Sequence, residues 1–196
     1  MAVEFELKFR CRPETQQQLR QELPGEETRF LMETTYYDTP DGDLSARRYT
    51  LRQRQENDTS VCTLKTPAAQ GGRGEFEVNC PDIHQALPEL CKLSGIDLAA
   101  LTAKGLVPVC GAQFVRIAKT FPWREATIEL ALDRGLLTGG ERVEELCEAE
   151  LELKAGSLED LKAYGAFVAA AYGLEVEERS KFRRALDLAK GENTVV

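Results

Sequence analysis

Acidic and basic residues recur at every second position in seven segments of this chain. In the first, VEFELKFR at residues 3–10, the charged residues Glu4, Glu6 and Lys8 alternate with apolar ones. Because successive side chains of a β-strand point to opposite faces, such alternation places all the charges of a strand on one face. If the seven segments are strands of one sheet, that face carries nine acids and eight bases: Glu4, Glu6, Lys8, Arg10, Arg52, Arg54, Lys65, Arg73, Glu75, Glu77, Arg116, Glu129, Asp133, Glu148, Glu150, Glu152 and Lys154.

Acids and bases gathered on one face could hold a phosphate chain together with metal ions. Arginine binds phosphate oxygens through its planar fork, and lysine contributes a point charge. Clustered glutamates would repel a polyanion unless divalent cations lay between them, and carboxylates favour hard ions such as Mg²⁺ or Mn²⁺. The pattern therefore indicates phosphoryl transfer. Two alternatives stay open: faces that are simply solvated, and an ion-pair network with a purely structural role.

Eight predicted strands carry the charged segments. They cover residues 2–11, 29–38, 48–56, 60–66, 73–79, 113–122, 125–133 and 143–154. Helices are predicted at 14–23, within 82–105, at 158–172 and at 181–189. Helices need an apolar sheet surface to pack on, and the uncharged sides of the strands provide one. We therefore expect an α+β fold, an eight-stranded antiparallel β-barrel with helices packed outside and a charged lumen.

Composition limits the classes of protein. The net charge of −8 argues against nucleic-acid binding, and no stretch approaches the ~20 apolar residues of a membrane helix. His84 is the single histidine, so catalysis by histidine and multi-histidine metal sites are not expected. Six cysteines without a CxxC pair indicate reduced thiols and, with no visible signal peptide, a cytoplasmic protein. We expect one domain at residues 1–190 and a disordered tail at 191–196.

The charged segments resemble motifs of the CYTH superfamily, the triphosphate tunnel metalloenzymes. EFELK at 4–8 is similar to the ExExK signature of that family. Further blocks follow in the family's order: YYDT at 36–39, LRQR at 51–54, TLK at 63–65, RGEFE at 73–77, FVR at 114–116, IELALDRG at 128–135, EAELEL at 148–153 and SKFRRA at 180–185. The likeness covers nearly the whole chain and is nearest to the CYTH domain of bacterial inorganic triphosphatases.

The resemblance implies a role for each charged position in a tunnel that binds triphosphates with Mg²⁺ or Mn²⁺. The implied metal ligands are Glu4, Glu6, Glu148 and Glu150, with Glu129, Asp133 and Glu152 completing a second ion's shell or orienting water. The implied phosphate-binding bases are Lys8, Arg52, Arg54, Lys65, Arg73, Arg116 and Lys181, with Arg184 as second choice on the last helix. Glu4, Glu6 and Lys8 would form the catalytic set, and Glu75 and Glu77 are tunnel acids of open role. Lys119 has the opposite parity to Arg116, so Arg116 is expected in the lumen unless a bulge reverses the choice.

The implied reaction is hydrolysis of inorganic triphosphate (tripolyphosphate) to pyrophosphate and phosphate. Water would attack a terminal phosphorus while the bases neutralise charge on the phosphates. Thiamine triphosphatase, nucleoside triphosphatase and class IV adenylate cyclase remain alternatives, but the sequence shows no clear aromatic platform for an organic group. A non-catalytic polyphosphate- or nucleotide-binding module is the alternative from another class. The clustered acids argue against it, because a pure anion binder gains nothing from them.

Overall fold

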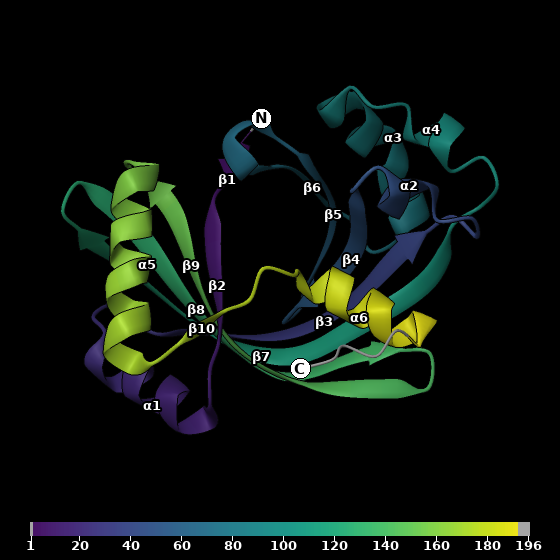
Figure 1. The fold of residues 1–196 in the computed structure, drawn as a ribbon. Helices are drawn as coiled ribbons and strands as arrows, with labels where there is room; N and C mark the ends of the chain where they lie inside the picture. The colour runs from purple at the N-terminus through teal and green to yellow at the C-terminus, as the bar shows by residue number, and fades with distance from the viewer. Residues whose placement is uncertain (1, 192–196) are drawn as a thin grey trace.

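A computed structural model describes residues 2–191, apart from the side chains of residues 2 and 70. Within these residues a single antiparallel sheet of ten strands curves around an interior (Figure 1), in the order β1-β6-β5-β4-β3-β7-β8-β9-β2-β10. The strands are β1 (Ala2–Glu4), β2 (Glu6–Arg10), β3 (Thr28–Asp38), β4 (Thr50–Glu56), β5 (Thr59–Pro67), β6 (Arg73–Asn79), β7 (Val107–Trp123), β8 (Ala126–Gly139), β9 (Arg142–Ala155) and β10 (Glu175–Val176). The helices are α1 (Pro13–Glu22), α2 (Asp43–Ala46), α3 (Ile83–Ser94), α4 (Leu98–Leu101), α5 (Leu158–Tyr172) and α6 (Lys181–Lys190), with a 3-10 turn at Ala69–Gly71.

The α+β class and all eight predicted strands are confirmed, but the expected eight-stranded closed barrel is wrong in detail, because the sheet has ten strands and its ladder is not closed. The predicted first strand breaks at Phe5 into β1, which pairs with β6, and β2, which pairs with β9. The N-terminal segment therefore spans both sides of the curved sheet, but the hydrogen-bonded ladder is interrupted at Phe5. The short strand β10 adds to the free side of β2. Neither β10 nor the four-residue helix α2 is long enough to give a periodic signal in the sequence.

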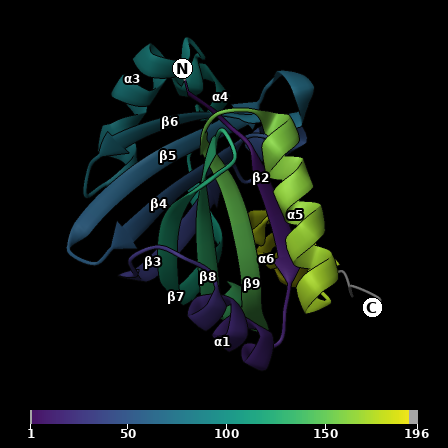
Figure 2. The same cartoon turned by 90° about the vertical axis from the view of Figure 1, so that its left-hand side faces the viewer.

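Two apolar clusters cover the outer face of the sheet, which is the uncharged side of the strands. Leu19 of α1 and Leu161 of α5 pack with Leu151 of β9 in the first cluster, and Figure 2 shows these helices beside β2, β8 and β9. Leu90 of α3 packs with Leu64 of β5 in the second. Each of these leucines is fully buried, which stabilises the fold by about 1.5–3 kcal/mol per side chain. This is the outer packing that the alternation predicts.

Helix α6 departs from the predicted outer packing because it lies against the inner face. Phe182 and Ala185 join an apolar cluster with Phe114 of β7 and Leu146 of β9, whose parity is that of the charged inner residues. Gly139 of β8 permits this close approach, since a Cβ there would lie 2.3 Å from the carbonyl oxygen of Ala185. The helix thus fills one end of the lumen and delivers its first residue, Lys181, to the charged part.

Two further expectations concern the chain's ends and membranes. The expected tail at 191–196 lies outside the described residues, except for Gly191, which caps α6 in a left-handed conformation at φ 72°. Between residues 2 and 191, no helix has the combination of length and apolar character that crossing a membrane requires.

Candidate functional site

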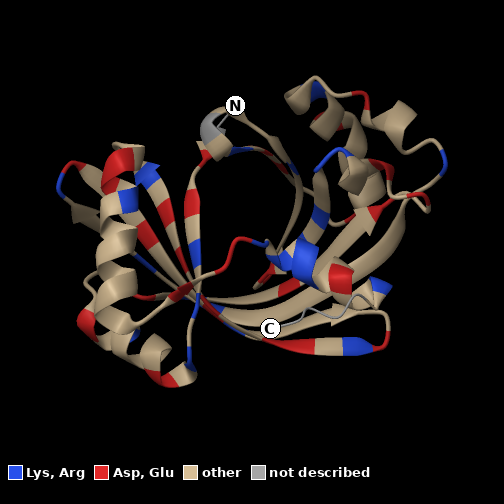
Figure 3. Ribbon diagram, viewed as in Figure 1, with Lys and Arg blue, Asp and Glu red and all other residues tan. Residues whose placement is uncertain are grey.

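A charged cavity of about 280 Å³ lies inside the curved sheet. Its acidic lining residues are Glu4, Glu6, Glu56, Glu75, Glu77, Glu129, Glu150 and Glu152, and its basic ones are Lys8, Arg52, Arg54, Lys65, Arg73, Arg116, Lys154 and Lys181. Figure 3 shows acidic and basic positions recurring along β2, β8 and β9, the strands that supply six of these sixteen residues. Fourteen of the seventeen alternating charges therefore line a shared cavity, and the reading of separate solvated faces does not hold for them. The other three are Asp133, Glu148 and Arg10, and Arg10 pairs with Glu177 instead.

The inner position on β7 belongs to Arg116. Its guanidinium lines the cavity, whereas the Lys119 ammonium donates to the carbonyl oxygens of Leu23, at 3.0 Å, and Arg20 below helix α1. The β7–β8 register runs without a bulge through both positions. The parity of their positions along β7 therefore suffices to tell which of the two bases faces the cavity.

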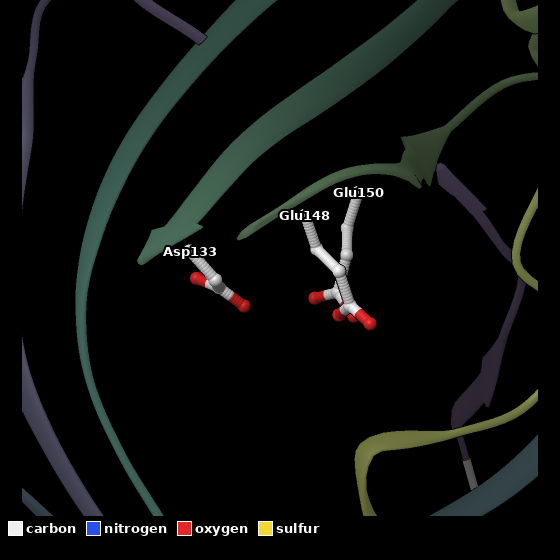
Figure 4. Close-up of side chains that lie close together, drawn as sticks. All are labelled: Asp133, Glu148 and Glu150. Atoms are coloured by element: carbon white, nitrogen blue, oxygen red, sulfur yellow. The ribbon is translucent and has the colours of Figure 1, made fainter. Parts of the chain in front are cut away.

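Three carboxylates converge at the deep end of the cavity. Asp133, Glu148 and Glu150 offer oxygen atoms that lie within 4.8 Å of one another, and Figure 4 shows their carboxylates directed to a common space. The Lys181 ammonium lies between them, 2.8 Å from Asp133, 2.6 Å from Glu148 and 2.7 Å from Glu150. Arg116 makes a bidentate contact with Asp133, both bonds 2.7 Å, and reaches Glu150 at 2.5 Å. Two bases thus contact three acids, and this group is called the deep cluster below.

Arg184 sits behind the deep cluster instead of in the cavity. Its guanidinium donates to Glu148 and Glu144, and it is absent from the cavity lining. Of the two candidate bases on the last helix, Lys181 is therefore the one that faces the cavity. Asp133 and Glu148 are fully buried and likewise do not line it.

The electrostatics of the deep cluster favour the charged forms of Asp133, Glu150 and Lys181. Burial opposes ionisation of Asp133 and Glu150, but Arg116 and Lys181 outweigh it and lower the pKa of both carboxyls. Burial likewise opposes the charge on Lys181, yet Asp133, Glu150 and Glu148 raise the pKa of its ammonium. For Glu148 burial prevails and raises the pKa. The cluster is a set of mutually dependent charges in a site with little water.

The catalytic set proposed from the sequence lies on the cavity wall in separate ion pairs. Lys65 contacts Glu4 at 2.5 Å and Glu75 at 3.1 Å. Lys8 contacts Glu6 at 3.1 Å. Each glutamate thus has a lysine partner that another anion could take over.

Arg52 and Arg54 are cavity bases whose carboxylate contacts are all longer than 3.5 Å. The Arg52 guanidinium lies 3.6 Å from Glu75 and 3.7 Å from Glu77, and its buried Nε has no hydrogen-bond partner among the described residues. Burial lowers the pKa of Arg54 to about 10, and its nearest carboxylate, that of Glu56, is 3.7 Å away. A buried guanidinium without a close counter-ion costs free energy, so this wall is suited to an incoming anion.

Lys154 lines the cavity. The sequence placed it on the charged face of its strand but gave it no role in metal or phosphate binding. Its ammonium bridges Glu152, at 2.9 Å, and Glu129, at 3.3 Å, which are direct cross-strand partners. Burial raises the pKa of Glu152, while the two carboxylates overcome burial and raise the pKa of Lys154. Lys154 has the same strand parity as Glu148, Glu150 and Glu152, and this parity is the signal that would have identified it as a site residue.

The donor set of the cavity fits a hard divalent ion, because it consists of carboxylates alone. In the deep cluster the Lys181 ammonium already occupies the space between the three acids. Of the acids that line the open cavity, Glu4, Glu6, Glu129 and Glu152 lie outside the deep cluster and could hold a metal. Both carboxylate oxygens of Glu150 already accept hydrogen bonds, from Lys181 and Arg116.

A second cavity, of about 660 Å³, adjoins the first. The two share seven lining residues, Glu4, Glu6, Lys8, Thr50, Arg73, Ser180 and Phe182. The second adds the aromatic residues Phe5 and Tyr49 and the bases Arg48, Lys162, Arg179 and Arg183. The sequence showed no aromatic platform because these residues come together only in the fold.

Comparison with known proteins places the chain in a family. Residues 2–186 match the model of the CYTH domain, and the chain belongs to this family. It is 32% identical over 168 residues to an inorganic triphosphatase of Haemophilus influenzae, over 82% of this chain and 48% of the relative. The chain thus spans about half the length of the curated relative.

Solved structures share the fold at low identity. A Hippeastrum protein, reported as a candidate adenylyl cyclase with a dominant triphosphatase activity, superposes with a TM-score of 0.62 at 19% identity, over 100% of this chain and 98% of its own. A protein from Pyrococcus horikoshii OT3 superposes with a TM-score of 0.64 at 21% identity, over 94% of this chain and 99% of its own.

Proposed function

We propose that this chain hydrolyses inorganic triphosphate to pyrophosphate and phosphate, with Mg²⁺ or Mn²⁺ as the cofactor. The observation that carries the proposal is one cavity lined by eight bases and eight acids, in which Arg52 and Arg54 lack close carboxylate partners. A bare triphosphate needs several converging bases. The similarity to the Haemophilus influenzae inorganic triphosphatase supports this choice of substrate.

The ion pairs of the cavity wall suggest how the site accepts its ligands. Phosphate oxygens can replace the glutamates as partners of Lys8 and Lys65, whose present contacts are Glu6 and Glu4. The released carboxylates of Glu4 and Glu6 would then be available to hold a metal ion. Phosphate and metal thus compensate both halves of each pair, and neither ligand alone does so. We assign five further bases as phosphate contacts: Arg52, Arg54, Arg73, Arg116 and Lys181.

The reaction itself requires a positioned water and neutralisation of phosphate charge. When bound, the divalent ion supplies Lewis-acid stabilisation and a more acidic water. Glu129 and Glu152 face each other across the β8–β9 ladder and are placed to hold the ion or to orient water. The bases hold the chain in line for attack on the terminal phosphorus and stabilise the pyrophosphate that leaves.

The test is turnover of tripolyphosphate with Mg²⁺, Mn²⁺ or EDTA, read as released phosphate and pyrophosphate. We expect metal-dependent release that EDTA abolishes. The double variant Glu4→Gln, Glu6→Gln should lose more than 99% of this activity, as expected for loss of metal-positioned chemistry of about 10²–10⁴-fold. Absence of turnover with every metal would instead leave a non-catalytic phosphate-binding module.

An organic triphosphate is the second candidate substrate, and the second cavity favours it. Phe5, Tyr49 and Phe182 border this space, which opens directly from the charged cavity. Thiamine triphosphate and ATP should therefore be compared with tripolyphosphate under the same conditions, with cyclic AMP measured as well. Preference for the bare chain, unchanged by Tyr49→Ala, would support the first proposal. Preference for an ester, lost in Tyr49→Ala, would support the second.

A further inference from the structure

The ring of Phe114 lies within 6 Å of three cations, two of them buried and one, Arg116, partly buried. The distance from the ring centroid is 5.6 Å to the guanidinium carbon of Arg54, 5.8 Å to that of Arg116 and 5.5 Å to the ammonium of Lys181. These cations come from β4, β7 and α6, which are distant in sequence. Phe114 itself is 5% exposed and does not line the cavity, so it lies beneath the bases.

Three like charges around one point repel each other, and something must offset that repulsion. The negative face of a phenyl ring attracts cations within about 6 Å, and the attraction grows when water is excluded. Arg116 and Lys181 also have carboxylates within hydrogen-bond distance. Arg54 does not: its closest polar partner is the Thr34 hydroxyl, at 2.9 Å. The ring is therefore a principal stabilising contact of the Arg54 guanidinium.

The backbone that carries the ring packs closely against β8. Gly135 of β8 is the cross-strand partner of Phe114. A Cβ at Gly135 would lie 2.5 Å from the Phe114 Cα and 2.7 Å from its Cβ, so no larger residue fits there. Phe182 of α6 packs in the same apolar cluster. A ring held in a packed cluster keeps one position, so it can orient cations that are carried on flexible side chains.

We propose that Phe114 is a positioning residue of the anion site: its ring holds Arg54, Arg116 and Lys181 as one preorganised set for the phosphates. This inference rests on the proposed function, since the anion is taken to be triphosphate. Without the attraction of the ring, the three cations separate in the empty site, and binding must bring them together again.

Fluorination of the ring tests this directly, because each fluorine weakens the negative face with little change in size. Phe114 is replaced in turn by mono-, di- and trifluorophenylalanine, and tripolyphosphate affinity is measured without metal. We expect Kd to rise step by step, by about tenfold over the series. In metal-dependent turnover the same series should raise KM more than it lowers kcat. The matched control is Phe121 on the same strand, which is 3% exposed and has no cation contact among the described residues.

The outcomes separate the positioning role from the proposed function. A flat Kd across the Phe114 series, tighter binding, or an equal change in the Phe121 series would overturn the positioning role. If the wild type binds no tripolyphosphate, the proposed function fails. The midpoint of urea unfolding is then measured for each fluorinated variant instead of the tripolyphosphate Kd. A midpoint that falls with each fluorine at Phe114 but not at Phe121 would still support a ring that holds cations. A midpoint that does not change along the Phe114 series would overturn the positioning role. Phe114→Leu keeps an apolar side chain but has no ring, so its unfolding midpoint should match that of the trifluoro variant.

Discussion

The ammonium of Lys181 lies 2.6 Å from a carboxylate oxygen of Glu148, and both groups are buried. Lys181 is the first residue of α6, and Glu148 lies in the middle of β9. The contact therefore ties the helix that fills one end of the lumen to the charged wall. It also supplies the deep cluster with an internal cation, so under the proposed function a metal would bind the cavity acids that lie outside this cluster.

Removing that internal cation should destabilise the fold strongly. Lys181→Met leaves Asp133, Glu148 and Glu150 with too little positive charge, and we expect a loss of about 3–5 kcal/mol in the free energy of unfolding at pH 7. Urea denaturation measures this value. Lys162→Met, on the exposed face of α5, should change stability by less than about 0.5 kcal/mol. Equal effects of the two substitutions would contradict the proposed role of Lys181.

Metal affinity should distinguish the cavity acids from the deep cluster. Glu4→Gln should weaken Mn²⁺ binding at least about tenfold, as expected for loss of one charged ligand. Glu148→Gln should lower stability while leaving Mn²⁺ affinity within about threefold, because its oxygens are taken by Lys181 and Arg184. Calorimetric titration of each variant with Mn²⁺ provides the comparison. A larger loss of affinity in Glu148→Gln would place the metal in the deep cluster.

Arg52 should contribute to substrate binding more than to stability. Its buried Nε has no partner in the described part of the chain, so a phosphate oxygen would provide its missing hydrogen bond. We expect Arg52→Gln to raise KM for tripolyphosphate by about 10–100-fold, the value of one charge-assisted hydrogen bond. Arg29→Gln, an exposed residue of β3, serves as the matched control and should leave KM unchanged. An unchanged KM in Arg52→Gln would remove Arg52 from the site.

The segment between α5 and α6 should carry an acid-sensitive contact. Burial opposes ionisation of Glu177, but hydrogen bonds from Arg179 and Arg10 outweigh it and lower the pKa to about 2. A depressed pKa adds stability that is fully present above the ordinary value of about 4.5 and disappears as the pH falls toward 2. Glu177→Gln should therefore be less stable than the wild type at pH 7, by about 2 kcal/mol. The two proteins should converge in urea denaturation near pH 2–3, and a pH-independent difference would argue against this contact.

The sequence predicts the charged wall well because strand parity is a local property. Alternation alone separates Arg116, which lines the cavity, from Lys119, which points below α1. Local signals also define α5, where Ser157 caps the first turn and Gly173 ends the helix at φ 62°. Residues 158–172 are helical as predicted.

Features that depend on contacts between distant segments could not be predicted in this way. The inner position of α6 requires Gly139 on β8 to admit the helix backbone, and nothing local indicates that contact. The deep cluster unites β8, β9 and α6, so the occupation of its centre by Lys181 becomes visible only in the fold. The break at Phe5 likewise follows from the change of partner from β6 to β9.

The most direct test of the account is a crystal structure with Mn²⁺ and a non-hydrolysable triphosphate analogue, with manganese located by anomalous scattering. We predict manganese beside the carboxylates of Glu4 and Glu6, with the phosphates contacting Arg52 and Arg54 in the cavity. Lys181 should remain within hydrogen-bond distance of Glu148. Manganese that displaces Lys181 from the deep cluster, or an analogue bound outside the cavity, would contradict the account.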